Sequence, residues 1–320
     1  MSGGLLQMSG IVVDFVHRVP HLPSPGEEVE AVDTVITAGG GFNAMVAAKR
    51  FGIAVSYGGA LGTGALADIA RTQLRDHHIP ALMEGQASID QGSCVVLVDP
   101  RGERSFISRH GAERRIDPAS LDRVPVAEFD WVLLSGYSLY KEHSARAFVP
   151  WLARLPRGRH FFFDPGPMVA AIPEAHLDAA LARADWVSAN AREARSLTGL
   201  ADPAAAARRL SQGRQGALVR CGAEGCWLAT PGNGVQHIDG FAVETVDTTG
   251  AGDTHDGAFI ASSQHGYMPH DAAVLANAAA AISTTRHGPV AAPGLEETLA
   301  FLRARRVDVK RRATDRRVEQ

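Results

Sequence analysis

A glycine-rich stretch from Asp247 to Phe259, DTTGAGDTHDGAF, carries the residues best suited to chemistry. Asp253 directly follows the turn of residues 250–252, which leads into an apolar helical sequence. The first amides of a helix lack internal partners and carry partial positive charge, and glycine lets a ligand approach the backbone closely. Such a turn suits a phosphoryl group, and a carboxylate beside it can accept a proton from an attacking hydroxyl. This pattern favours phosphoryl transfer to an alcohol.

The acids and the histidine of this stretch also have structural interpretations. Asp253 can cap the helix, with Asp256 three residues later as a weak capping box, and the stretch alone leaves base and cap open. Asp256 can stabilise the positive helix end, and His255 can be a packed or surface histidine. Of the two acids we expect Asp253 to do the chemistry. Asp256 lies one helical turn, about 4.5 Å, further on and toward the flank of the helix.

The surrounding sequence alternates short apolar strands with helical segments. Strands are expected at AVSYGGAL, WVLLSG, HFFFDPGP, DWVSAN and GALVRCG, with helices between or after them. This alternation is typical of a mostly parallel sheet covered by helices on both faces. Ligands of such sheets bind beyond the carboxyl ends of the strands. We therefore expect an α/β fold whose crevice is lined by Gly136, Asp164, Asn190 and Gly222.

Other β-rich segments lie in the N-terminal third of the chain. LLQMSGIVVD is predicted to be one buried strand that ends at Asp14. Residues 15–37 and 93–109 are predicted to form a small separate β-layer, and DPRG at 99–102 has the residues of a type I turn in a hairpin. A two-stranded hairpin with apolar residues on both sides needs a partner surface. We therefore expect a homodimer formed through these strands.

Composition limits the function classes. The chain has 320 residues, 45% hydrophobic and 21% charged, as in an ordinary soluble globular protein. Its net charge of -3 gives no reason to expect a nucleic-acid partner. No apolar run reaches the roughly 18 residues of a membrane span, and no secretory signal is visible, so we expect a cytoplasmic protein. Cys94, Cys221 and Cys226 are expected to be reduced thiols rather than a metal site.

Several motifs resemble those of the ribokinase-like (PfkB) carbohydrate and nucleoside kinases, in the same order along the chain. The stretch 247–259 resembles the C-terminal signature of that family, and AGGGFNAMVAAKRFG at 38–52 resembles its N-terminal signature. NARE at 190–193 resembles the Asn-x-x-Glu motif, and VRCGAEG at 219–225 the glycine loop on the nucleotide side. LANAAAAISTTRHG resembles the segment that closes the adenine pocket.

The resemblance implies an ATP-dependent kinase of a sugar or nucleoside hydroxymethyl group, with Mg²⁺ and a ribokinase-like fold carrying a small β-sheet lid. It implies that Asp253 is the general base and that Glu193 organises Mg²⁺ through water. The other implied site residues are the anion hole Gly250, Ala251 and Gly252, the sugar-binding Asp14, Gly39, Gly40 and Asn43, the ATP-binding Asn190, Gly222, Gly225 and Asn277, and Asp247, Thr249 and Gly288 at a K⁺ site. We expect the kinase domain to span residues 1–302, with a basic, flexible tail at 303–320.

Departures from the family pattern leave the substrate open. GGGF at 39–42 lacks the lysine of typical ribokinases, which puts ribose in doubt and leaves nucleosides, fructose-like sugars and other polyols. Met45 stands where the N-terminal signature prefers a small side chain. His255 and Asp256 replace residues that are often apolar or small.

Two alternatives belong to other function classes. Gly62, Gly64 and Ala67 follow a predicted strand, and Glu84 comes twenty residues after Gly64, as in the fingerprint of a dinucleotide-binding oxidoreductase. A non-catalytic sugar-binding regulator is the other alternative. Loss of the base would mark such a regulator, whereas Asp253 is present.

Overall fold

A large, mostly parallel sheet forms the centre of the molecule. The computed structural model describes residues 3–312 apart from 84, 87 and 289, and within these residues the sheet has eight strands in the order β12-β11-β10-β9-β8-β7-β1-β4. The strands are β1 Leu5–Gln7, β4 Val55–Tyr57, β7 Trp131–Ser135, β8 His160–Asp164, β9 Trp186–Asn190, β10 Gly216–Arg220, β11 Gly225–Thr230 and β12 Gly234–Asp239. The strands from β4 to β10 are parallel, whereas β11 and β12 run antiparallel at one edge. The predicted α/β sheet is confirmed.

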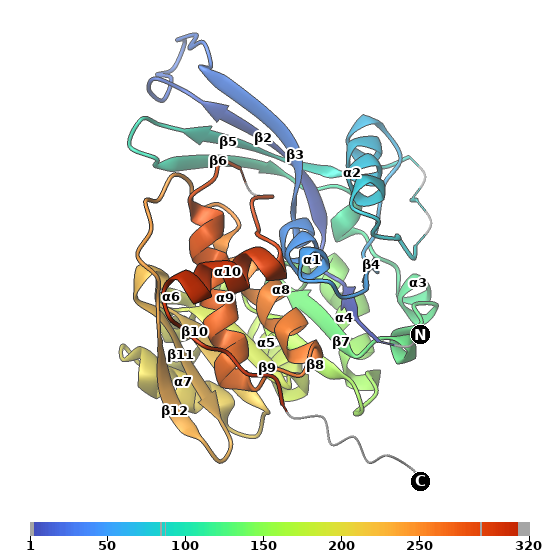
Figure 1. Cartoon of the computed structure of the whole chain (residues 1–320). Helices are drawn as coiled ribbons and strands as arrows, with labels where there is room; N and C mark the ends of the chain where they lie inside the picture. Colours follow the sequence, from blue (N-terminus) through green and yellow to red (C-terminus); the bar gives the residue numbers. More distant parts are fainter. Residues whose placement is uncertain (1–2, 84, 87, 289, 313–320) are drawn as a thin grey trace.

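Helices cover both faces of this sheet (Figure 1). They are α1 Gly41–Arg50, α2 Ala65–Asp76, α3 Pro118–Asp122, α4 Glu142–Arg154, α5 Glu174–Arg183, α6 Ala191–Thr198, α7 Pro203–Ser211, α8 Ala251–Gln264, α9 Pro269–Thr284 and α10 Leu295–Ala304. The run HFFFD in β8 shows why the strands lack polar alternation. Phe162 packs toward Phe259 of α8, while Phe161 and Phe163 belong to the core on the other face. A strand buried on both faces reads as a continuous apolar run.

The N-terminal strand is divided between two sheets, which corrects the prediction of one strand ending at Asp14. β1 stops at Gln7, and β2, Ile11–Arg18, pairs in the small sheet. The Gln7 side chain accepts a hydrogen bond from the Ser9 amide (2.9 Å) and donates to the Gly41 carbonyl (3.2 Å). These contacts satisfy the backbone where the chain leaves the main sheet. The apolar pattern continues across this break, so periodicity does not reveal it.

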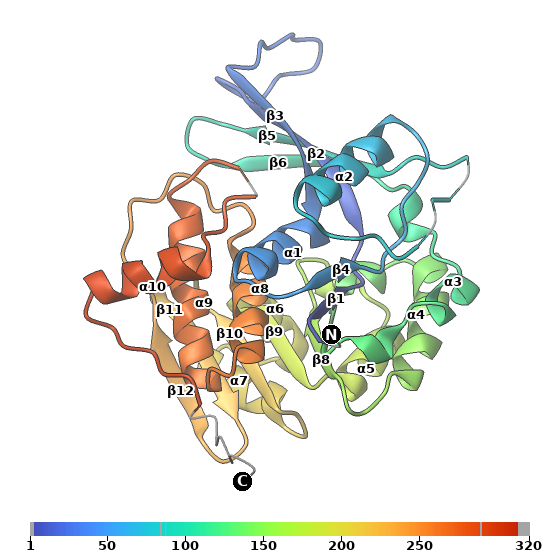
Figure 2. The ribbon, with the colours of Figure 1, turned by 45° about the vertical axis from the view of Figure 1, so that its right-hand side comes forward.

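The small sheet, called the lid here, has the strand order β3-β2-β5-β6 in the described residues, with β3 Asp33–Gly40, β5 Gly92–Val98 and β6 Arg104–Arg109. It stands above the main sheet in both Figure 1 and Figure 2. The predicted hairpin is confirmed, and the Gly102 amide donates to the Asp99 carbonyl across its turn (2.9 Å). Because β2 begins at Ile11, Asp14 belongs to the lid.

The chain after α10 returns to the body of the protein. Val307 and Val309 pack against the core, and the Arg312 amide donates to the Gly266 carbonyl (2.8 Å). The first part of the predicted basic tail is therefore packed, and residues 313–320 lie outside the described residues. Among the described helices, none combines the length and apolar character that a bilayer crossing requires.

Candidate active site

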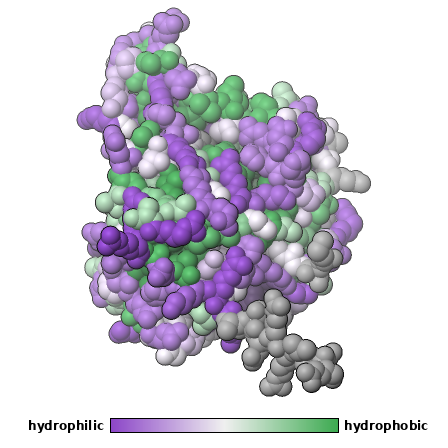
Figure 3. Space-filling view, in the orientation of Figure 1, coloured by the Kyte–Doolittle hydropathy of each residue, from purple (hydrophilic) through white to green (hydrophobic). Residues whose placement is uncertain are grey.

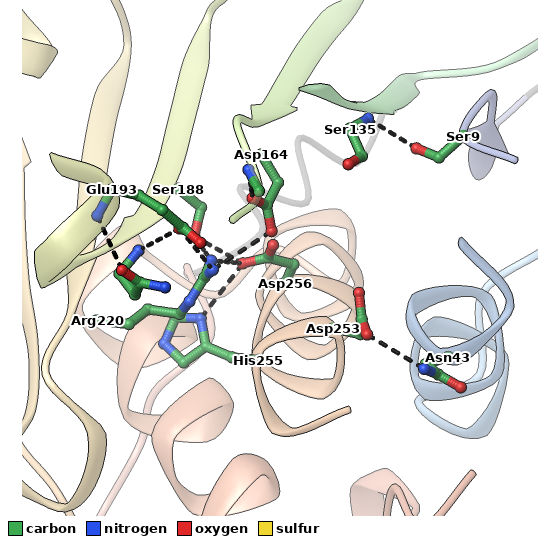
Figure 4. Close-up of polar contacts among 12 residues, drawn as sticks. Ser9, Asn43, Ser135, Asp164, Ser188, Glu193, Arg220, Asp253, His255 and Asp256 are labelled. Carbon is green, nitrogen blue, oxygen red and sulfur yellow. Dashed lines mark hydrogen bonds and ion pairs between the residues drawn. The ribbon is translucent and has the colours of Figure 1, made fainter. Parts of the chain in front are cut away.

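The start of α8 forms an open cluster of backbone amides. Gly250 is the N-cap residue with φ 73°, a left-handed conformation that favours glycine, and α8 begins at Ala251, before Asp253. No side chain of the described residues caps this helix. Asp253 lies in the first turn, where its carboxylate accepts a hydrogen bond from Asn43 Nδ2 of α1 (3.2 Å) (Figure 4). The interpretation of Asp253 as a helix cap is therefore wrong. The Ala251 amide makes a long hydrogen bond to the Thr248 carbonyl (3.3 Å), and no side chain of the described residues occupies the amides at the start of α8, which suits an anion there.

Asp253 has the electrostatic setting of a general base. Burial raises its pKa to about 6, against a smaller lowering by the Asn43 hydrogen bond, and Asp256 and Glu193 add to the rise. Burial likewise raises the pKa of Asp14 to about 7, with the charge of Asp253 as the second cause. A carboxylate with a pKa near neutrality suits proton abstraction at physiological pH.

The predicted sugar-binding residues gather where the lid meets α1. Asp14 lies on β2 beside Gly39 of β3, and a Cβ added at Gly39 would lie 1.9 Å from Asp14 Oδ2. Gly40 has φ 62° and precedes α1. Asn43 Oδ1 is buried without a hydrogen-bond partner in the described part of the chain. This acceptor belongs to a side chain that contacts the Asp253 carboxylate, and it suits a hydroxyl donor of a polyol.

A buried ion cluster lies beside Asp253 (Figure 4). Arg220, at the end of β10, pairs with Asp256 (2.8 Å), Asp164 (3.3 Å) and Glu193 (3.8 Å). Ser188 of β9 donates to Asp256 (2.6 Å) and contacts Arg220. Asp256 is only 2% exposed, and its partners are Arg220 and Ser188 rather than the amides at the helix start, so the expectation that it stabilises the positive helix end is wrong. Its charge balances Arg220 rather than the helix end.

Arg220 is a site residue that the sequence interpretation missed. Its guanidinium nitrogens would lie 3.5–3.6 Å from a Cβ at Gly252, directly beside the predicted anion hole. A usable signal was present, because the apolar strand GALVR ends in a cation while the nearby strand HFFFD ends in an acid. Parallel strands bring such ends to one edge of the sheet. The pairing of Arg220 with Asp256 of α8, however, required the fold.

Most of the residues predicted to bind ATP have visible structural roles: they cap a helix, take backbone conformations that favour glycine, or join two elements by hydrogen bonds. Asn190 and Glu193 form a reciprocal capping box at the start of α6. Gly222 (φ 62°) and Gly225 (φ 96°) are in conformations that favour glycine. Asn277 donates to the carbonyls of Ile238 (3.0 Å) and Asp239, and its Oδ1 lies 3.1 Å from His255 Nε2.

These contacts give His255 and Asn277 structural roles. His255 is 3% exposed, and burial lowers its pKa, so the neutral ring is favoured. The polar atoms of Asn277 are engaged within the protein. Any contribution of Asn277 to nucleotide binding would therefore come through packing, whereas its hydrogen bonds join α9 to β12.

The dinucleotide fingerprint has another physical explanation. Gly62 and Gly64 precede α2, but β4 is an edge strand of the main sheet. The Asp90 carboxylate already accepts hydrogen bonds from the first-turn amides of Leu66 (3.2 Å) and Ala67 (2.9 Å). A pyrophosphate would have to displace this acid. Glu84 lies outside the described residues.

Comparison with protein families matches residues 6–296 to the pfkB family carbohydrate kinases. The chain belongs to this family. It is 32% identical over 302 residues to the uncharacterized sugar kinase YegV of Escherichia coli K12, covering 92% of each chain. It is 27% identical to the ribokinase of Haemophilus influenzae, covering 94% of this chain and 99% of the relative. The ribokinase structure of Thermotoga maritima superposes with a TM-score of 0.80 at 26% identity, covering 94% of this chain and 99% of that one.

The resemblance to ribokinase-like kinases and the predicted fold class are thus confirmed. The kinase is a phosphotransferase with an alcohol group as acceptor. This result excludes both alternatives, the oxidoreductase and the non-catalytic regulator. Cys94, Cys221 and Cys226 form no disulfide, and no cluster of three or more metal-binding side chains occurs among the residues described.

Proposed function

We propose that the kinase transfers the γ-phosphoryl group of ATP to a hydroxymethyl group of a sugar or nucleoside, with Asp253 as general base. The observation that carries this proposal is the Asp253 carboxylate, with a pKa raised to about 6, in the first turn of a helix whose N-terminal amides no side chain caps. The acceptor hydroxyl would lose its proton to Asp253. The amides of Gly250, Ala251 and Gly252 would bind the transferring phosphoryl group.

Asp14, Gly39, Gly40 and Asn43 are proposed to hold the acceptor. The free Oδ1 of Asn43 would accept a hydroxyl hydrogen bond, while its Nδ2 orients Asp253. Gly39 leaves room for Asp14, because any side chain there would collide with the carboxylate. The absence of a lysine in the segment 39–42 keeps nucleosides and fructose-like sugars beside ribose as candidates.

ATP and Mg²⁺ are proposed to bind on the other side of Asp253 from the acceptor. Asn190, Gly222 and Gly225 would border the nucleotide. Among the described residues no three acids, histidines or cysteines converge on a metal position, so Mg²⁺ would rely on phosphate oxygens and water. Glu193 is the acid proposed to orient that water. The ion would supply charge neutralisation at the phosphates.

Homodimerisation through the lid is also proposed. Hydrophobic side chains are exposed on its strands, with Phe106 62% and Ile107 67% exposed on β6 and Ile36 48% exposed on β3. Figure 3 shows green, hydrophobic surface in the upper part of the molecule, which includes the lid. Covering such residues with a second lid would remove apolar surface from water.

The test is ADP release by the purified protein with ATP, Mg²⁺ and a panel of pentoses, hexoses and nucleosides. One compound in the panel should stimulate ADP release well above the rate without acceptor, and the phosphate should be found on its hydroxymethyl group. Asp253→Asn should abolish this stimulation, while Asp178→Asn, a matched change at an exposed acid of α5, should not. Transfer to another kind of hydroxyl, or full activity of Asp253→Asn, would contradict the proposal.

A further inference from the structure

Asp247, expected to bind K⁺, is fully engaged by hydrogen-bond donors of the protein. Its Oδ1 accepts from Arg104 (2.5 Å), the Thr249 amide (2.9 Å) and the Thr249 hydroxyl (2.7 Å). Its Oδ2 accepts from the Gly288 amide (3.1 Å) and from Arg18 (3.4 Å). Five donors leave this 6%-exposed carboxylate no free position.

These contacts do not fit a monovalent cation at Asp247. Two of the five donors are positively charged guanidinium groups, and each of them occupies a position on one oxygen of Asp247. Two guanidinium groups already neutralise the carboxylate, and they would repel an added cation at this short range. With the lid in this position, the two arginines on Asp247 do not fit the predicted K⁺ site at Asp247, Thr249 and Gly288.

Both arginines come from the lid. Arg18 is the last residue of β2, and Arg104 is the first residue of β6. Arg104 also donates to Thr248 Oγ1 (3.1 Å), and Arg18 contacts His287 Nδ1 (2.6 Å). The lid is thus fastened to two segments of the body, 247–249 and 287–288. The first of these runs directly into the turn that carries the proposed anion hole.

We propose that Arg18 and Arg104 take the place of a monovalent cation and position the turn that binds the transferring phosphoryl group. They act through Asp247, which holds the Thr249 amide just before Gly250. Because the arginines belong to the lid, closing the lid over the acceptor and ordering the anion hole become one event. This inference rests on the proposed function and makes the kinase independent of K⁺.

The double variant Arg18→Gln with Arg104→Gln tests the proposal. Glutamine keeps a polar side chain and removes both charges, which frees Asp247 for an external cation. Two substitutions of equal chemistry at arginines that do not touch Asp247 are the control. Arg101→Gln lies on the same hairpin and pairs only with Asp99 in the described residues, and Arg123→Gln lies after α3.

Two measurements are made in KCl, NaCl and tetramethylammonium chloride at equal ionic strength. The first is the steady-state rate with ATP, Mg²⁺ and the best acceptor of the panel. The second is thermal unfolding without substrates. Wild type and control should give the same rate and Tm in all three salts. The double variant should lose about tenfold or more in kcat with a smaller change in the KM of the acceptor, because small misplacements of catalytic groups are costly. In the double variant, K⁺ should restore part of the lost rate and raise the Tm, whereas wild type and control should show neither effect.

Three outcomes would overturn the inference. One is a wild type that is faster and more thermostable in K⁺ than in the other salts. The second is a double variant whose kcat and KM match the control. The third is a slow double variant that K⁺ neither accelerates nor stabilises. The unfolding measurement needs no acceptor, so failure to find a sugar substrate would refute the proposed function while the salt dependence still decides the role of the arginines.

Discussion

Asp253→Asn should separate activity from stability, because the site holds this carboxylate at an energetic cost. Burial raises its pKa from 3.8 to about 6. At about 1.4 kcal/mol per pKa unit, ionised Asp253 costs the folded state up to roughly 3 kcal/mol. Partial solvent access reduces this figure, so we expect about 1–3 kcal/mol. Asparagine has a similar shape, keeps an oxygen for Asn43 and carries no charge.

The sign of the effect follows from proton binding. Between pH 3.8 and about 6 the folded state binds more protons at Asp253 than the unfolded state, so wild-type stability falls as pH rises through this range. Above about pH 6 the full cost is present. Asp253→Asn should therefore be more stable than wild type at pH 8, by about 2–4 °C in Tm for a chain of this size. The difference should vanish toward pH 4.

The same variant should lose about 10²–10⁴-fold in turnover, or about 3–5 kcal/mol of transition-state stabilisation. ADP release and thermal unfolding are measured between pH 4 and pH 8 on wild type, Asp253→Asn and the exposed control Asp178→Asn. Wild-type turnover should fall as pH drops through about 6–7, where Asp253 and the neighbouring Asp14 take up protons. An Asp253→Asn protein that is equally destabilised at every pH would refute the electrostatic reasoning, and retained turnover would refute the assignment of the base.

The other predictions concern charge balance, metal and assembly. Arg220→Met leaves three buried acids without their cation and should lower the free energy of unfolding, measured by urea denaturation, by about 3–5 kcal/mol or more. Asp256→Asn should lower it less, because Asp164 and Glu193 still face Arg220, and equal losses would contradict this account. Glu193→Gln keeps an oxygen for the α6 cap and should raise the Mg²⁺ concentration needed for activity with little change in the KM of the acceptor, so an unchanged Mg²⁺ titration would count against the assignment. Light scattering at micromolar concentration should show a dimer that Ile107→Asp dissociates and Leu200→Asp, at an exposed leucine outside the lid, does not; a monomeric wild type would remove the lid interface.

Local chemistry in the sequence indicated the turn that is proposed to bind the phosphoryl group. Glycine at positions 250 and 252 indicates a backbone that an anion can approach, and Asp253 places a carboxylate beside it. These residues are neighbours in the chain, so the pattern can be read without the fold. The apolar strands ending in Asp164 and Asn190 likewise indicate a parallel sheet with polar residues at its carboxyl edge. The apolar composition of these strands reflects burial of both faces of the sheet. This composition is visible in the sequence itself.

Contacts between distant segments were decided only by the tertiary structure. The break after Gln7, the pairing of Arg220 with Asp256 and the approach of Arg18 and Arg104 to Asp247 join residues far apart in the chain. In the sequence, an arginine on a strand is most simply interpreted as a solvated charge. Its side chain is long, and the sequence does not say which carboxylate it reaches. Its meaning depends on which carboxylate the fold brings within reach, and that is a property of the packed sheet and lid rather than of any local pattern.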